Sequence, residues 1–265
     1  MVRLIAFLVG LFMAGWLLVS AGVTTYEMIS DPAKPTIEAK YYKHAKEVSF
    51  AHEGPLGKYD NRQLQRGFKV YTEVCSSCHS LHQIAFRNLE DIGYSEPEVK
   101  AIAKGWATKQ PTFDTVTGDR AERDNLPADK IPMIYYAGQG HPPDLSLITK
   151  ARHDGPAYVY SLLTGYNKPV PKDVTVPDGL NYNPYFANLN IAMAAPLAAD
   201  GQVTFDDGSK NDIKSMAKDV SAFLTWTAEP KMNQRKTAGW AALIFLLIFT
   251  GLTYLSYRQI WAGKK

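Results

Sequence analysis

Two cysteine residues, Cys75 and Cys78, are the only ones in the chain, and His79 follows the second directly. The spacing C-x-x-C-H is typical of c-type haem attachment. In a helical turn, a two-residue gap places both sulfurs on one side, at a separation that suits the two vinyl groups on one edge of a haem. The next imidazole then points over the ring face, where its Nε2 atom can bind iron. The motif therefore predicts one haem c, covalently bound through Cys75 and Cys78, with His79 as an iron ligand.

Other uses of these residues fit the sequence less well. A thioredoxin-like dithiol would need a βαβ pattern nearby, and none is visible. A zinc site would need further ligands at close spacing, whereas the other histidines are scattered and no third cysteine exists. A disulfide without function would leave His79 unexplained.

The sixth iron ligand decides between electron transfer and other haem chemistry. An open sixth position would suit a peroxidase or a gas sensor, whereas a sulfur or nitrogen ligand restricts the protein to passing electrons. The candidates are Met133, Met193, Met216 and Met232. Met216 belongs to an apolar helix face, Met232 to the membrane boundary, and Met133 could be a core residue. Met193 lies in a loop of small residues that allows close approach to a flat ring, so the residues favour it over Met133.

The overall charge excludes a nucleic-acid binder, because the chain of 265 residues has a formal net charge of only +3. Residues 28–230 contain 25 acidic and 22 basic residues, a net of −3. The basic surplus lies at the two ends of the chain. A slightly acidic body with basic ends suits a membrane anchor and a cationic partner.

The N-terminal region has the pattern of an export signal. Residues 4–19 are wholly apolar, follow Arg3, and are succeeded by small residues. This pattern predicts a secretory signal peptide, residues 1–21, with cleavage after Ala21; the alternative is an uncleaved N-terminal anchor. Either case exports the residues that follow.

The C-terminal region predicts a single transmembrane helix. Residues 238–257 carry no charge and are flanked by basic residues on both sides. Since the body is exported, we expect residues 22–235 to be a periplasmic haem domain, and residues 236–265 to be the anchor with a short cytoplasmic tail.

Between these ends, the sequence predicts mainly α-helical structure. Capping residues and apolar spacing indicate helices over residues 61–74, 95–107, 155–164 and 210–227. A strand pattern is nearly absent, and long stretches rich in Pro, Gly and Asn read as irregular: residues 30–60, 108–133, 138–147 and 166–201. Loops of this length need an organising element, which a large buried prosthetic group would supply. The expected fold is a cytochrome c-like haem domain with long irregular loops.

Several separated motifs resemble one family. They are QLQRGFKVYTEVCSSCHS (63–80), PPDLSLI (142–148), ARHDGPAYVYSLLTGY (151–166), GLNYNPYF (179–186), NIAM (190–193), FDDGS (205–209) and MAKDVSAFLTWTAEP (216–230). In this order they are similar to the cytochrome c1 family of the alphaproteobacterial or mitochondrial type. The similarity covers most of residues 50–262.

The resemblance implies roles for further residues. It makes Met193 the sixth ligand of the haem iron, and it places Arg152 against a haem propionate with Tyr158 nearby. It also implies that a carbonyl of the segment containing Pro143 accepts the His79 Nδ1–H, which would fix the imidazole tautomer. The chain departs from the family after the methionine, where alanines replace a run of prolines.

The family also implies a function in the respiratory chain. Its members are electron-transfer subunits of ubiquinol–cytochrome c reductase (complex III), which take one electron from the Rieske iron–sulfur protein and pass it to a cytochrome c. The expected partners are thus cytochrome b, the Rieske protein, a cytochrome c and membrane lipid in the bacterial inner membrane, with the quinol site in cytochrome b. The alternative is a membrane-anchored c-type cytochrome that serves another oxidase or dehydrogenase.

Overall fold

A computed structural model describes residues 1–32, 34–138 and 140–264. The chain divides into two compact units, Met1–Tyr41 and Tyr42–Lys265. The first unit contains the long helix α1 (Val2–Ser30) and the short helix α2 (Ile37–Tyr41), which lies in a stretch expected to be irregular. Helix α1 passes through the expected cleavage position after Ala21 and continues to Ser30.

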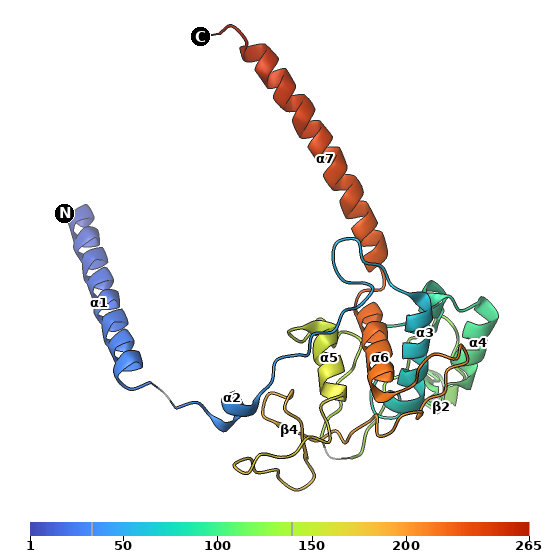
Figure 1. Ribbon diagram of the computed structural model, residues 1–265. Helices are drawn as coiled ribbons and strands as arrows, with labels where there is room; N and C mark the ends of the chain where they lie inside the picture. Colours follow the sequence, from blue (N-terminus) through green and yellow to red (C-terminus); the bar gives the residue numbers. More distant parts are fainter. Residues whose placement is uncertain (33, 139, 265) are drawn as a thin grey trace. The chain divides into compact units, whose positions relative to one another are not determined.

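Three helices form the centre of the second unit: α3 (Asn61–Val70), α5 (Gly155–Leu163) and α6 (Ile213–Ala228). Helices α3 and α5 both pack against α6, which lies between them in Figure 1. Helix α3 begins at Asp60, whose Oδ1 atom accepts the N–H of Arg62 at 3.0 Å. Helix α6 begins at Asp212, whose Oδ1 atom accepts the N–H of Ser215 at 3.0 Å. The helices expected over 61–74, 155–164 and 210–227 are therefore confirmed.

The contact between α3 and α6 is unusually close because a glycine lies at the crossing. A Cβ atom on Gly67 would lie 2.1 Å from the carbonyl oxygen of Asp219, so only glycine lets the two backbones approach this far. Beside the crossing, the rings of Phe68, Trp106 and Phe223 form an aromatic cluster, with Phe68 at 6.3 Å and 5.5 Å from the other two ring centroids.

Helix α4 (Glu96–Gly105) follows the short 3-10 helix η2 (Phe86–Ile92) and packs against it. Its start matches the expected cap, because Glu98 Oε2 accepts hydrogen bonds from the backbone N–H of Ser95 at 2.7 Å and from its hydroxyl at 2.6 Å. The helix expected over 95–107 is confirmed, whereas η2 was not expected.

The expectation of irregular structure over 108–133 is wrong in part. Strands β1 (Gln110–Phe113) and β2 (Arg120–Arg123) form an antiparallel hairpin within this stretch. All four residues of β2 are exposed, so this strand has no apolar alternation for a sequence pattern to reveal. A second, two-residue ladder joins β3 (Asn181–Tyr182) to β4 (Asn190–Ile191) in the stretch 166–201.

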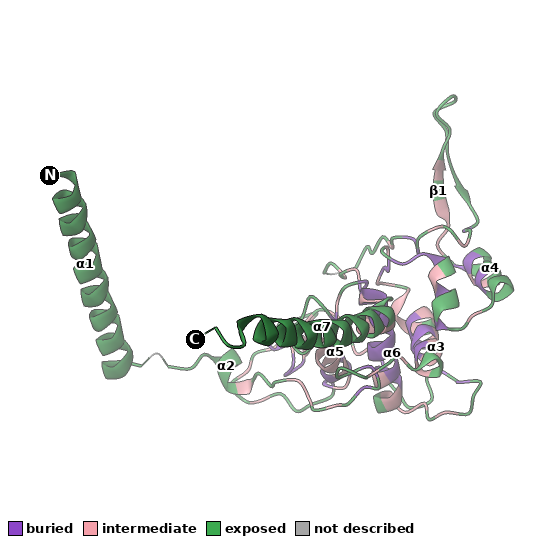
Figure 2. Cartoon of the chain, turned by 90° about the horizontal axis from the view of Figure 1, so that it is seen from above, coloured by how far each residue is buried: buried purple, intermediate pink, exposed green. Residues whose placement is uncertain are grey.

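The chain ends in helix α7 (Met232–Trp261). By length and composition, α1 and α7 are each long and apolar enough to cross a membrane. Figure 2 shows both helices as exposed along almost their whole length. Apolar helices that bury nothing within the protein are expected to be covered by another apolar medium.

Candidate functional site

The C-x-x-C-H motif occupies the end of α3. The helix continues as a π-helical turn, η1 (Tyr71–Cys75), of the kind that occurs frequently at functional sites. The carbonyl oxygen of Cys75 accepts the N–H groups of both Cys78 and His79, at 3.1 Å and 2.9 Å. One tight turn therefore carries both thiols and the imidazole, as the motif predicts.

Both thiols are free, and the surroundings of Cys75 do not suit redox chemistry. Burial, followed by the proximity of Cys78, raises the pKa of Cys75 to about 12. A thiol with this pKa stays protonated at neutral pH and is a poor thioredoxin-like nucleophile. In the described part of the chain, no group of three or more His, Cys, Asp or Glu side chains is placed to hold a metal ion.

His79 is oriented by the backbone of a distant segment. Its Nδ1 atom lies 2.8 Å from the carbonyl oxygen of Pro143, the hydrogen bond expected from the resemblance. A carbonyl can only accept, so Nδ1 carries the proton and Nε2 is left with a free lone pair. Burial is the largest influence on the pKa of His79 and lowers it; although the Pro143 carbonyl acts in the opposite direction, the net shift favours the neutral imidazole. This is the form in which histidine binds metals.

Asp144 holds Pro143 in place. Its carboxylate accepts the backbone N–H of His82 at 2.9 Å and that of Ser146 at 2.8 Å, and it lies 2.6 Å from His82 Nδ1. Burial opposes ionisation of Asp144, but these hydrogen bonds hold its pKa below the usual 3.8. The sequence analysis did not single out Asp144 or His82, although an Asp two residues before a Ser is a recognisable turn signal.

Met193 lies on a half-buried loop that reaches the same segment. Its carbonyl oxygen accepts hydrogen bonds from the Tyr166 hydroxyl at 3.1 Å and from Asn181 Nδ2 at 3.4 Å. On the neighbouring turn, a Cβ atom added to Gly140 would lie 3.3 Å from the Cβ of Ala192. The short stretch from Gly140 to Pro143 thus contacts the Met193 loop at one end and His79 at the other.

The other methionines differ in position. Met216 is fully buried in α6, as expected, and Met232 is also buried. The suggestion that Met133 could be a core residue is wrong, because its side chain is 70% exposed. In the same segment, Ile131 is buried in the core, and the N–H of Ile134 donates to Ser80 Oγ at 2.8 Å. Met133 therefore also lies in a segment that contacts the motif region.

Arg152 and Tyr158 lie together at the start of α5. Arg152 is exposed, and Tyr158 is half-buried. Burial raises the pKa of the Tyr158 hydroxyl, while the charge and hydrogen bond of Arg152 act in the opposite direction. Within the described residues, no carboxylate forms an ion pair with Arg152, so its guanidinium group is available to an acidic group of a ligand.

The side chains around the motif fit a haem. The donor set comprises two thiols on one turn and an imidazole with a free Nε2; the Met193 loop and Arg152, which forms no ion pair with a carboxylate of the described residues, add a thioether and a guanidinium group. Large apolar side chains in the adjoining segments are exposed, with Met133 at 70%, Tyr135 at 93% and Leu147 at 49%. Exposed apolar groups gathered near one motif indicate a surface that an apolar ligand covers.

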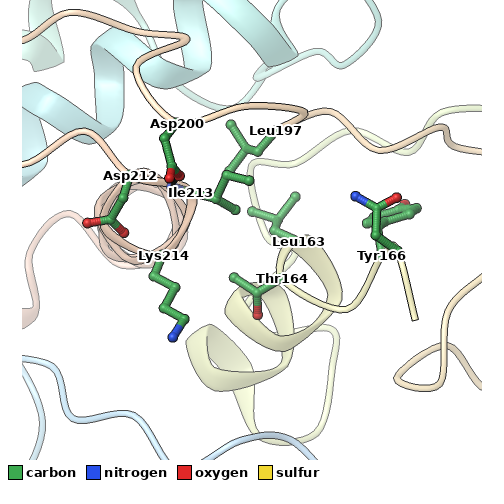
Figure 3. Close-up of a pocket in the computed structure, with 9 residues that line it drawn as sticks. Leu163, Thr164, Tyr166, Leu197, Asp200, Asp212, Ile213 and Lys214 are labelled. Carbon is green, nitrogen blue, oxygen red and sulfur yellow. Dashed lines mark hydrogen bonds between the residues drawn. The ribbon is translucent and has the colours of Figure 1, made fainter. Parts of the chain in front are cut away.

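A separate pocket of ≈ 500 Å³ lies between the end of α5 and the start of α6 (Figure 3). Asp200 and Asp212 line it, but their carboxylates already accept the first backbone N–H groups of α6. Neither a thiol nor an imidazole is among its lining residues, which are Leu163, Thr164, Tyr166, Asn167, Leu197, Asp200, Asp212, Ile213 and Lys214. The pocket is therefore distinct from the C-x-x-C-H site.

The model of the Cytochrome C1 family matches residues 50–264. The protein "Cytochrome b/c1" of Bradyrhizobium diazoefficiens is 44% identical over 245 residues, which is 82% of this chain but 35% of that protein. The chain thus spans about a third of the length of this relative.

Two fungal relatives match over most of their own length. "Cytochrome c1, heme protein, mitochondrial" of Kluyveromyces lactis is 39% identical over 235 residues, which is 86% of this chain and 80% of that protein. "Cytochrome b-c1 complex catalytic subunit, mitochondrial" of Candida albicans is 40% identical over 264 residues, 96% of this chain and 91% of that protein.

Proposed function

Because the chain belongs to the cytochrome C1 family, we propose that it is the electron-transfer subunit of a ubiquinol–cytochrome c reductase complex. The chain accepts one electron from a Rieske iron–sulfur protein and passes it to a cytochrome c. It takes part in the reaction of the redox complex without a quinol site of its own. The observation that carries this proposal is the single turn that presents both thiols beside an imidazole whose Nδ1 is held by Pro143.

The chain's own residues would hold the haem as follows. The thiols of Cys75 and Cys78 would hold the haem covalently through thioethers to its two vinyl groups, which would retain it in both oxidation states. His79, through Nε2, and Met193, through its sulfur, would be the iron ligands. When bound, haem supplies a one-electron iron couple, and a methionine ligand raises its potential.

Two further groups would position the haem. Arg152, with Tyr158 beside it, offers a charge-assisted hydrogen bond to a propionate, which a partly buried carboxylate requires. The Pro143 carbonyl keeps the proton on His79 Nδ1, so the imidazole stays in one tautomer and one orientation. Because all these roles concern binding and orientation, the chain makes or breaks no substrate bond.

The names of the relatives and the charge of residues 28–230 support the proposed partners. The relatives named "Cytochrome b/c1" and "Cytochrome b-c1 complex catalytic subunit" support a complex with cytochrome b. The excess of acidic residues over 28–230 suits brief docking of a basic cytochrome c, at a rate that falls as salt is added.

We assign α7 as the membrane anchor. The haem domain, residues 22–235, would then lie on the periplasmic side of a bacterial inner membrane, with the anchor and a cytoplasmic C-terminus in residues 236–265. The uncharged run 238–257 within α7 supports a membrane span, because its length matches the thickness of the hydrocarbon layer. The signal-like pattern of residues 1–21 supports the periplasmic side for the haem domain. Residues 1–21 would act as the signal peptide, or as a second anchor if they are retained.

Affinity purification through this chain tests the proposal. Membranes would be solubilised in mild detergent, and the eluate examined for a b-type haem by difference spectra and for an iron–sulfur centre by electron paramagnetic resonance. We expect both in constant ratio to the c-type haem. Elution of the c-type haem with an oxidase, and without b-type haem or iron–sulfur signal, would contradict the proposal.

A further inference from the structure

The loop of residues 51–58, here called the collar loop, joins the haem domain to the first turns of α7. The N–H of Lys58 closes the loop by donating to the carbonyl oxygen of Ala51 at 3.1 Å. Its turn is tight, since a Cβ atom on Gly57 would lie 1.9 Å from the carbonyl oxygen of Glu53. The collar loop therefore has one compact shape that a side chain at position 57 would destroy.

A single ammonium group of α7 lies inside this loop. Lys236 Nζ donates to the carbonyl oxygens of His52 at 2.7 Å, Gly54 at 2.7 Å and Gly57 at 2.9 Å. An ammonium group has three donors, so the loop satisfies all of them with backbone oxygens. Hydrogen bonds to a charged donor are roughly twice as strong as neutral ones, and they fix the loop to the helix.

Two more contacts fix the height of the loop along α7. The indole Nε1 of Trp240 donates to the carbonyl oxygen of Pro55 at 3.1 Å. The N–H of Tyr59 donates to Asn233 Oδ1 at 3.2 Å. The tip of the collar loop is therefore level with Trp240, one turn beyond Lys236.

That level lies at the edge of the assigned membrane span. Trp240 is the third residue of the uncharged run 238–257, about 3 Å below its start at 1.5 Å per residue. Tryptophan is enriched at this depth, where the indole ring meets the headgroups. Next to Pro55, the side chain of Leu56 is 74% exposed. A large apolar side chain at this level faces the boundary between headgroups and acyl chains.

We propose that the collar loop is a second membrane-contacting element, in which Lys236 and Trp240 hold the exposed Leu56 at the lipid interface beside α7. The inference rests on the proposed membrane span of α7. Contact at two places, the helix and the loop, would restrict the tilt of the haem domain on the membrane surface.

The features of the loop favour lipid over a protein partner. Lys58 and Lys231 are exposed basic residues at the same junction, which suits anionic headgroups. The tip of the loop offers one large apolar side chain, Leu56, between Pro55 and Gly57. A specific protein interface buries roughly 800 Å² on each side, which is far more area than one side chain supplies.

Depth measurement with a nitroxide label tests the proposal. The full chain with its haem would be placed in nanodiscs of phosphatidylcholine and phosphatidylglycerol, with the label introduced through L56C. V116C supplies a water reference, because Val116 at the hairpin tip is 91% exposed, and L252C supplies a bilayer reference within α7. Collisions with oxygen report apolar surroundings, and collisions with a polar nickel chelate report water.

We expect the label at position 56 to collide severalfold less with the nickel chelate than the label at position 116. Equal accessibility at positions 56 and 116, with position 252 protected, would overturn the inference and leave the span of α7 intact. Water-like accessibility at position 252 would show instead that the span is wrong. A label at position 56 that is protected from both reagents in the purified complex would indicate a protein partner and contradict lipid contact.

The role of Lys236 has a matched control. Lys236→Met removes the ammonium group from the three carbonyl oxygens, so we expect the accessibility of the label at position 56 to approach that at position 116. Lys210→Met makes the same change of charge at an exposed position just before α6 and should leave the label protected. An unchanged depth in Lys236→Met would contradict the proposed clamp. Labelling of the chain without any added cysteine would show that Cys75 and Cys78 are free, a failure of the haem assignment rather than of this inference.

Discussion

The two sides of the candidate haem site are built differently. Cys75, Cys78 and His79 follow α3, whose residues pack deep in the core. Tyr71, on the turn after α3, and Phe223, on the neighbouring α6, are both fully buried. The Met193 side is a half-buried loop, held through its backbone by Tyr166 and Asn181. Core packing and the bond to the Pro143 carbonyl define the first side, whereas hydrogen bonds to the backbone hold the second. We infer that the helical side sets stability and the loop side sets the iron ligand.

Gly67→Val should break the helical side. The added side chain would meet the backbone of Asp219 and the Cβ of Phe223, both in the core, and must push α3 away from α6. We expect the free energy of unfolding to fall by about 3 kcal/mol, the upper end for overpacking. Denaturant unfolding of the holoprotein measures this change. Gly105→Ala is the control, since a Cβ atom there meets nothing within 4 Å; an equal loss in both variants would contradict the account.

Met193→Leu should affect the loop side alone. Loss of the thioether should remove the sulfur–iron charge-transfer band in the near infrared and lower the reduction potential by on the order of 0.1 V or more. The unfolding of the helices should change by less than about 1.5 kcal/mol, because the two side chains have similar volume. Met133→Leu is the control, because Met133 is the other methionine in a segment that contacts the motif region. Loss of the band in that variant instead would assign the ligand to Met133.

The pH dependence of stability should arise partly from His52, a buried residue of the collar loop. Burial is the main cause that lowers the pKa of His52, and the Lys236 charge adds to it, while Glu53 opposes both. Below pH 6.5, the ordinary histidine pKa, His52 therefore binds a proton more readily in the unfolded chain than in the folded protein. The free energy of unfolding falls as the pH falls. The contribution is at most about 1.4 kcal/mol for each pH unit.

His52→Phe should remove this contribution. The free energy of unfolding would be measured at about pH 7, 6 and 5, an interval that covers the ordinary histidine pKa. His44→Phe, at an exposed position, is the control and should keep the wild-type slope. A slope unaltered by His52→Phe would contradict the assignment.

Tyr166→Phe should produce the smallest effect, and on the loop side. It removes the hydroxyl that donates to the Met193 carbonyl at 3.1 Å, a hydrogen bond worth about 1 kcal/mol. We expect the near-infrared band to be lost at a lower temperature, with the unfolding of the helices little changed. Tyr160→Phe, within α5, leaves this bond intact and is the control. An equal shift of the temperature in that variant would argue against the Tyr166–Met193 hydrogen bond.

The sequence predicts the helical side much better than the loop side. Helices α3, α4, α5 and α6 follow from local signals, such as the caps at Asp60 and Ser95 and the spacing of apolar residues. The hairpin of β1 and β2 was missed because β2 is exposed on both faces and has no apolar alternation.

Contacts distant in sequence were also missed. Asp144 orders the Pro143 carbonyl through bonds to His82, and Lys236 binds the carbonyls of His52 and its neighbours. Every residue has a backbone carbonyl oxygen, so no sequence motif indicates which carbonyl groups form such a contact. The exposure of Met133 was also missed, because it directly follows the buried residues Ile131 and Pro132 in one apolar run and no local signal marks where the chain leaves the core.

The mass of the denatured chain tests the central claim most directly. The purified protein would be unfolded in acid and organic solvent and its intact mass determined. The account predicts the mass of the polypeptide plus one haem, with the added mass on the peptide that contains Cys75 and Cys78. A polypeptide of unmodified mass, with the pigment released into the solvent, would contradict it.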